Sequence, residues 1–176
     1  TEINDLEKVQ ADEIIIATGA IPRENKFKGN GSAINVEDCL KGTVQMGNSV
    51  AVIGAGTTGC ELAYDLALQG KKVSLIAKDN YLVIGKKLCA ANTSMLRDEL
   101  MLHNVGIYTD AEIVEVNIDN IIICQKNKTQ KLACDTVISA IGYKPGTRLA
   151  KKEESHVPVI GDVKTVGNIK SAIYAA

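Results

Sequence analysis

The stretch SVAVIGAGTTGCELAYDLALQGKKVSLIAK, residues 49–78, decides the fold. Its apolar, β-branched start predicts a buried parallel strand over Val50–Ile53. Leucines and alanines at core spacing predict a helix over Thr57–Gln69, and Gly70 is expected to end that helix in the left-handed conformation. A second strand is expected over Val73–Ile76. The pattern therefore predicts an α/β protein built on a Rossmann-like βαβ unit.

Three glycines at GxGxxG spacing follow the first strand. Gly54 permits a tight turn, Gly56 leaves room for a pyrophosphate, and Gly59 lets the helix pack closely on the strand. Free N–H groups and the positive end of the helix dipole favour an anion there. The plainer alternative is a tight turn without a ligand. We predict dinucleotide binding by these residues: Gly54, Ala55, Gly56, Thr57, Thr58 and Gly59.

The end of the second strand bears on the choice between NAD and NADP. An acidic residue there would bind a ribose 2′-hydroxyl, whereas a basic one would accept a 2′-phosphate. The expected position falls near Ala77, which is neutral, and Lys78 and Asp79 follow. Lys78 would pair with NADP, or Asp79 would reach the ribose of NAD. A third possibility is that both charges are merely solvated.

The composition narrows the partners and the cellular location that we expect for this protein. The chain has 176 residues, 45% of them hydrophobic, and a formal net charge of −1. This charge gives no electrostatic basis for binding nucleic acid or an anionic membrane. No apolar run approaches the roughly 20 residues that span a bilayer, and the start lacks the features of a signal peptide. We expect a cytoplasmic protein with no nucleic-acid or membrane partner.

The five cysteines show no CxxC pair and no zinc-ligand spacing. We therefore expect no metal site and mostly buried, reduced thiols. Cys60 lies in the first turn of the predicted helix, a position that stabilises a thiolate. We expect packing rather than reactivity at this residue.

Upstream of the βαβ unit, a buried strand is expected over Ile14–Ala17. Residues 28–48 are polar and glycine-rich, which suggests a linker with a short helix over Val36–Leu40. Residues 1–45 are thus assigned to a remnant of a neighbouring domain and its linker. The first strand has no partner of its own nearby.

Downstream, a helix capped by Asn92 is expected over Asn92–His103, followed by a strand over Gly106–Thr109. Alternating apolar residues then predict a three-stranded antiparallel meander, with a turn over Gln125–Gln130 and its last strand over Lys131–Cys134. Further strands are expected over Thr136–Ile141 and Val157–Ile160, and Gly167-Asn168-Ile169 is expected to lead into a helix that stops at Ala176. We assign residues 46–150 to the dinucleotide-binding domain and residues 151–176 to the neighbouring domain.

With these elements in place, the chain resembles the nucleotide-disulfide oxidoreductases, in which an NAD(P) domain is inserted into a flavin domain. The resemblance covers nearly the whole chain. Ala17-Thr18-Gly19 looks like the turn returning from the flavin domain, and Ala140-Ile141-Gly142-Tyr143-Lys144-Pro145 looks like the motif closing the NAD(P) domain. Gly161-Asp162 looks like the motif whose aspartate contacts FAD. The resemblance implies FAD contacts from Thr18, Gly19, Gly161 and Asp162, and NAD(P) contacts from Ala140 and Gly142.

Residues 34–59 and 161–169 look most like the carboxyl-terminal part of the NADH:flavin oxidoreductase, 2,4-dienoyl-CoA reductase and 2-enoate reductase family. This likeness implies that an FMN-binding barrel and an iron–sulfur cluster precede this region in the full protein. Glu61 would lie near the junction of nicotinamide and flavin, as in related GxGxxGxE reductases. It is otherwise an ordinary acid near a helix N-terminus.

The resemblance implies hydride transfer from NAD(P)H to FAD. Because the cofactors carry that chemistry, no catalytic residue is assigned in this stretch. We expect the piece alone to be inactive, since its flavin and barrel domains would be missing. Two alternatives remain: a flavin-dependent disulfide or peroxide reductase, and a nucleotide-binding module without chemistry.

Overall fold

The computed structural model describes residues 6, 9–24, 26–82, 89–146 and 157–174. The chain divides into two compact units. The larger unit is Glu24–Gly142, and the smaller combines Thr1–Arg23 with Tyr143–Ala176.

A five-stranded parallel sheet forms the centre of the larger unit, in the order β2-β9-β3-β4-β5. Its strands are β2 (Ile34–Asn35), β3 (Ser49–Ile53), β4 (Lys72–Ile76), β5 (Gly106–Tyr108) and β9 (Thr136–Ser139). The first strand of the βαβ unit, β3, is central: Val50 pairs with Val73 on one side and with Thr136 on the other. Because β3 is covered on both faces, four of its five residues are buried.

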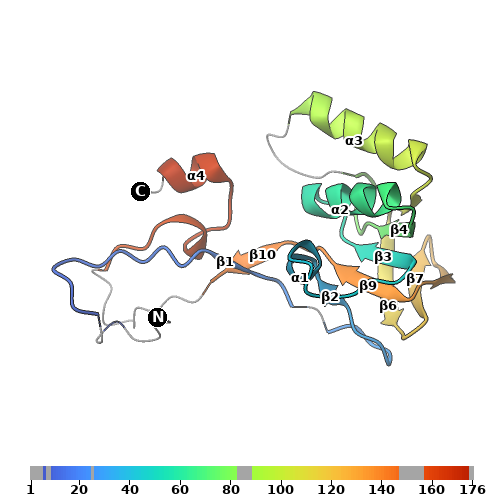
Figure 1. The fold of residues 1–176 in the computed structure, drawn as a ribbon, viewed down its shortest axis with the longest axis horizontal. Helices are drawn as coiled ribbons and strands as arrows, with labels where there is room; N and C mark the ends of the chain where they lie inside the picture. The colour runs from blue at the N-terminus through green and yellow to red at the C-terminus, as the bar shows by residue number, and fades with distance from the viewer. Residues whose placement is uncertain (1–5, 7–8, 25, 83–88, 147–156, 175–176) are drawn as a thin grey trace. The chain divides into compact units, whose positions relative to one another are not determined.

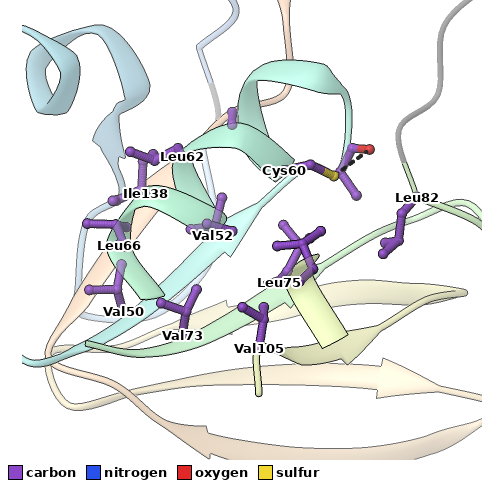
Figure 2. Packing of buried hydrophobic residues seen from close by; sticks show 14 of the residues in the cluster. Val50, Val52, Cys60, Leu62, Leu66, Val73, Leu75, Leu82, Val105 and Ile138 are labelled. Carbon is purple, nitrogen blue, oxygen red and sulfur yellow. Dashed lines mark hydrogen bonds between the residues drawn. The ribbon is translucent and has the colours of Figure 1, made fainter. Parts of the chain in front are cut away.

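Two helices, α2 (Thr57–Leu68) and α3 (Ala90–Leu102), lie on one face of this sheet (Figure 1). Val50 and Val52 point toward them and share a core with Leu62 and Leu66 of α2 (Figure 2). Gly70 ends the first helix as expected, with φ of +79°. The predicted βαβ unit is therefore confirmed.

The antiparallel meander covers the other face of the sheet. It consists of β6 (Ala111–Val116), β7 (Asn120–Gln125) and β8 (Lys128–Ala133). The alternate residues of β3, Ala51 and Ile53, share a second core with Ile121 and Ile123 of β7. The α/β fold with a parallel sheet and a three-stranded meander is thus confirmed.

The last meander strand begins earlier than predicted. Lys126 and Asn127 have φ of +50° and +60°, so they form a two-residue hairpin turn of the kind that matches strand twist. Pairing resumes at once, with Lys128 opposite Gln125. The predicted six-residue polar turn was wrong because a strand with one solvated face has polar residues of its own.

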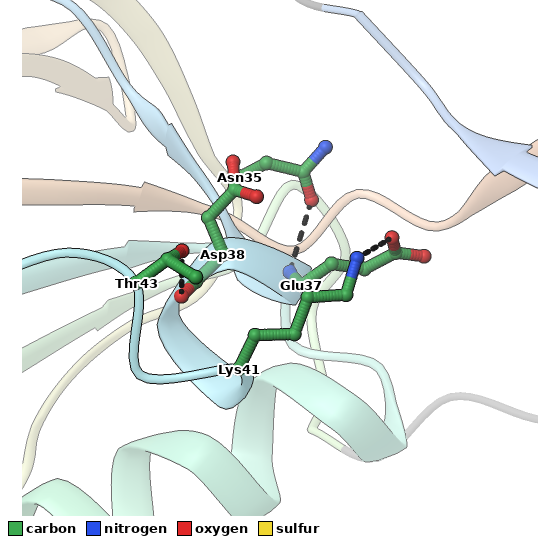
Figure 3. Close-up of polar contacts among 5 residues, drawn as sticks. All are labelled: Asn35, Glu37, Asp38, Lys41 and Thr43. Atoms are coloured by element: carbon green, nitrogen blue, oxygen red, sulfur yellow. Dashed lines mark hydrogen bonds and ion pairs between the residues drawn. The ribbon is translucent and has the colours of Figure 1, made fainter.

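The expected linker contributes to the larger unit. Ile34 and Asn35 form the edge strand β2, which pairs with β9. The chain continues directly from β2 into α1 (Val36–Leu40). The Asn35 side chain caps α1 by accepting a hydrogen bond from the Glu37 N–H at 3.1 Å (Figure 3). The contacts therefore group residues 24–45 with the larger unit, whereas the sequence suggested a linker and a remnant of the neighbouring domain.

The second sheet-covering helix also starts earlier than predicted. Cys89 occupies the N-cap, and Asn92 lies within the first turn of α3, so the assignment of Asn92 as the cap was wrong. At the other end, His103 is the C-cap and lies 3.4 Å from the Glu99 carboxylate. Its ring also packs against Tyr64 of α2, with centroids 5.5 Å apart. This contact holds the two helices together.

In the smaller unit, the predicted strands over Ile14–Ala17 and Val157–Ile160 are reduced to one parallel bridge between Ile16 and Val159. The regular strand pairing in this unit joins two segments distant in sequence: β1 (Ala20–Pro22) pairs antiparallel with β10 (Tyr143–Pro145). A 3-10 turn, η3 (Gly161–Val163), and the helix α4 (Ile169–Tyr174) follow. The predicted end of that helix at Ala176 lies outside the described residues.

Candidate functional site

The glycine corner lies between β3 and α2, where the chain leaves the carboxyl end of the central strand. Gly54 has φ of +104°, and a Cβ there would stand 2.5 Å from the Ala140 carbonyl oxygen. A Cβ on Gly59 would collide with the Gly54 carbonyl oxygen. Both positions therefore require glycine. Gly54 is needed for the turn and for the close approach of Ala140, and Gly59 is needed for close packing of the helix.

Gly56 differs from the other two glycines. Its backbone is extended, with φ of −70°, and no described atom lies within 4 Å of a Cβ placed on it. Gly56 is also the N-cap of α2, which has no side-chain cap and no acidic residue in its first turn. The amino end of this twelve-residue helix therefore has no side-chain cap of its own, and helix ends of this kind can bind an anion. Thr57 and Thr58 begin the helix at this end, and Ala55 is buried beneath it.

The motif expected to close the NAD(P) domain comes to the same corner. The Ala140 N–H donates to the Ile53 carbonyl at 2.7 Å, which fixes the end of β9 beside the end of β3. Gly142 follows with φ of +87°, a conformation that favours glycine. The structure therefore brings Ala140 to Gly54, and Gly142 follows two residues later.

The residues that follow β4 differ in how far they are buried. Ala77 is 1% exposed, and both of its backbone groups are used: its N–H donates to Tyr108 at 2.8 Å and its carbonyl accepts from Ala111 at 2.9 Å. Lys78 is exposed and lines a cavity of about 370 Å³ with Gly54. Asp79 is exposed and is not among the residues that line this cavity.

Glu61 lies one turn into α2 and is exposed. Together with Thr57 and Tyr64 it lines a groove of about 370 Å³ between α2 and α3. Glu61 thus shares a surface with the first residue of the helix, on the helical face of the sheet.

The two motifs assigned to FAD come together within the smaller unit. The Ile16 N–H donates to Pro158 at 2.9 Å and the Ile160 N–H donates to Ile16 at 3.0 Å. Thr18-Gly19 and Gly161-Asp162 therefore leave this parallel pair at the same end. One Asp162 carboxylate oxygen accepts from the Gly167 N–H at 3.1 Å. The residues that the sequence assigns to FAD thus lie together in the described part of the smaller unit.

The thiols differ in burial and in pKa. Cys60 is fully buried and its Sγ contacts the Ala55 carbonyl at 3.4 Å, in agreement with the expected packing role. Burial, followed by the nearby charges of Asp135 and Asp119, raises the pKa of Cys134 to about 11. Exposed Cys89 differs, because backbone N–H groups of Asn92 and Ala91 lower its pKa. Sequence reasoning missed Cys89 because it placed the helix start two residues too late.

Comparison with known proteins fits this geometry. The family model described as pyridine nucleotide-disulphide oxidoreductase matches residues 1–176. This chain therefore belongs to the pyridine nucleotide-disulphide oxidoreductase family, whose members use FAD and NAD(P)H. It is thus part of an oxidoreductase family.

Among curated proteins, the chain is 30% identical to cinnamate reductase of Clostridium sporogenes over 176 residues, covering 98% of this chain and 26% of that protein. It is also 30% identical to thioredoxin reductase 1 of Saccharomyces cerevisiae, covering 94% of this chain and 54% of that protein. Among solved structures, 2-naphthoyl-CoA reductase superposes with a TM-score of 0.79 at 28% identity, over 93% of this chain and 26% of that one. The chain thus spans between about a quarter and about half of these relatives.

Each helix in the described part of the chain is too short or too polar to span a bilayer. No group of three or more His, Cys, Asp or Glu side chains in that part of the chain is arranged to hold a metal ion.

Proposed function

We propose that this chain is the NAD(P)H-binding part of a flavoenzyme that passes hydride from NAD(P)H to FAD. The observation that carries the proposal is the glycine corner: Gly56 leaves space at the uncapped amino end of α2, beside the carboxyl end of the central strand β3. This is where open α/β sheets bind nucleotides, at the point where the strand order reverses.

The proposed roles follow from the geometry. Backbone N–H groups at the start of α2 bind the pyrophosphate, and the helix dipole favours its charge without a lysine. Gly54 and Ala140 fix the corner, while Gly142 and Glu61 border the remaining part of the dinucleotide. When bound, NAD(P)H supplies the hydride, so the chain's own residues need only bind, orient and exclude water.

The proposed flavin contacts are Thr18, Gly19, Gly161 and Asp162. The relatives that resemble enoate reductases are about four times longer than this chain. We further propose that the whole protein is an NADH:flavin oxidoreductase or an enoate or dienoyl-CoA reductase. FMN and an iron–sulfur cluster would then belong to its other domains. The chain alone would bind nucleotide without turnover.

The test is anaerobic reduction of the flavin in the whole protein by NADH and by NADPH, followed by flavin absorbance. A Gly56→Val variant places a branched side chain in the space kept for the pyrophosphate. We expect the nucleotide concentration for half-maximal reduction to rise at least about tenfold in this variant. Equal reduction in both proteins, or no reduction by either nucleotide, would contradict the proposal.

A disulfide reductase is the second candidate, favoured by the 30% identity to a thioredoxin reductase. This chain has no CxxC pair, so a redox dithiol would have to lie elsewhere in the protein. NADPH-dependent reduction of an aromatic disulfide by the whole protein would favour this candidate. Reduction of an enoate with no disulfide turnover would favour the first.

A further inference from the structure

The cavity at the carboxyl ends of β3 and β4 has a charged wall that the dinucleotide fingerprint does not include. It measures about 370 Å³ and combines an apolar floor with two opposite charges. Ile76 and Ile113 belong to the floor, and Lys78 and Glu112 are the charged residues, contributed by the end of β4 and by β6. Gly54 belongs to the same lining, so the cavity continues from the glycine corner.

The usual position for a ribose-binding acid is unavailable here. That position is occupied by Ala77, which is buried, has no polar side-chain atom and uses both backbone groups to hold Tyr108 and Ala111. Its hydrogen bond to Ala111 has a consequence for the meander: it fixes the first residue of β6 against the end of β4. Glu112 is the next residue, and it is thereby brought to the cavity wall.

Lys78 and Glu112 face each other across this wall. Lys78 Nζ lies 3.8 Å from the nearer Glu112 carboxylate oxygen, and the two side chains are 81% and 73% exposed. Such an exposed pair is weak, so both side chains remain free to bind a ligand. The carboxylate offsets the lysine charge where a 2′-phosphate would have to enter.

Two further acids lie close in sequence to Lys78 and Glu112. Asp79 follows Lys78, and the Asp110 N–H donates to the Asp79 carbonyl at 3.1 Å, which holds the two segments together. Lys78 is thus accompanied by three acidic residues, namely Asp79, Asp110 and Glu112. Coulomb repulsion from this excess disfavours a phosphate dianion, whereas a neutral ribose hydroxyl can donate to a carboxylate.

We infer that Glu112 is the specificity-determining residue for the nucleotide: it accepts hydrogen bonds from the adenosine ribose and makes the protein selective for NADH over NADPH. The inference rests on the proposed function, since it concerns the same dinucleotide. It assigns to the meander strand β6 the role that the end of β4 has in the usual fingerprint. Lys78 weakens the exclusion of NADPH, because its charge attracts the 2′-phosphate.

The test measures dissociation constants for NADH and NADPH on the whole protein by nicotinamide fluorescence. We expect the wild type to bind NADH roughly tenfold more tightly, and Glu112→Gln to remove most of that ratio. Lys78→Gln should increase the ratio by further weakening NADPH. Glu115→Gln is the matched control, because Glu115 lies on the same strand but does not line the cavity, and it should leave the ratio unchanged.

Two results would overturn the inference, and they are distinguishable. If both nucleotides bind but Glu112→Gln and Glu115→Gln have the wild-type ratio, or if the wild type prefers NADPH, Glu112 does not select the nucleotide and the proposed function stands. If the folded wild-type protein binds neither nucleotide, the proposed function fails and the inference fails with it.

Discussion

The Gly54 carbonyl oxygen occupies the place that a side chain on Gly59 would need. This relationship makes the first turn of α2 pack directly on the turn that leaves β3. The third glycine of the motif is therefore a packing requirement, while the second, Gly56, leaves open space. The two glycines should respond differently to substitution.

The first prediction contrasts these two glycines. Gly59→Ala must push α2 away from the corner, and we expect a loss of about 1–3 kcal/mol in the free energy of unfolding, as for an overpacked core. Gly56→Ala should cost less, about 0.5 kcal/mol for the poorer N-cap, because its backbone is not strained and no described atom is close. Urea denaturation of both variants measures the difference. Equal stability of the two would contradict the packing argument.

The second prediction concerns Asp135, which joins β9 to the start of β3. Its carboxylate accepts from the Asn48 N–H at 2.9 Å, the Ser49 N–H at 3.1 Å and the Thr136 hydroxyl at 3.0 Å. Burial, the largest single cause, raises the pKa of Asp135, but these hydrogen bonds, led by that of Ser49, together lower it below the ordinary value of an aspartate. Asp135→Asn should therefore cost about 1 kcal/mol of stability at neutral pH.

The pH dependence has a definite sign. Because the folded-state pKa of Asp135 is lowered, its contribution is complete above 3.8 and is lost as the pH falls through the folded-state value. Thermal melting between pH 7 and pH 2 should show wild type and Asp135→Asn converging at the acid end. Asp98→Asn, on exposed α3, is the control. A difference between wild type and Asp135→Asn that persists unchanged at pH 2 would be inconsistent with this account.

The third prediction concerns the tether after β4, by which we mean the contact between Arg97 of α3 and the Leu82 carbonyl. Arg97 of α3 donates from Nε and from a terminal nitrogen to the Leu82 carbonyl, at 3.2 and 3.0 Å. Arg97→Met keeps most of the side-chain length and removes both donors, so amide exchange at residues 80–82 should accelerate. Arg97→Lys has a single ammonium group, so its exchange rate should lie between those of the wild type and Arg97→Met. If exchange were the same in all three proteins, the tether would have no role.

The fourth prediction orders the thiols. A lowered pKa gives exposed Cys89 a larger thiolate fraction at neutral pH, whereas burial raises the pKa of Cys39 and of Cys134. A limiting amount of iodoacetamide should therefore label Cys89 first, and Cys134 only on unfolding. Mass spectrometry of the peptides measures the order. Labelling of native Cys134 as fast as Cys89 would refute it.

Much of the larger unit could be predicted from sequence because its signals are local. The apolar run at β3, the periodicity of α2 and the stop at Gly70 each lie within a few residues. The edge strand β2 was missed for the opposite reason. β2 has only two residues, and its existence depends on pairing with β9, about a hundred residues later.

The same contrast between local signals and long-range contacts holds for the candidate site. The glycine corner is a sequence motif, so its position could be predicted directly. Glu112 could not, because the relationship that brings it to Lys78 is the hydrogen bond between Ala111 and Ala77, which joins two segments distant in sequence. The sequence offered Lys78 and Asp79 as alternatives, and only the register of the meander adds a third charged residue.

The most direct measurement is hydrogen exchange of the whole protein with and without saturating NADH. Our account predicts slower exchange in the peptide covering residues 54–61, since the ligand would occupy the free N–H groups at the start of α2, and no such change in Gly56→Val. If NADH binds and this stretch exchanges at an unaltered rate, the nucleotide lies elsewhere and the central claim is wrong.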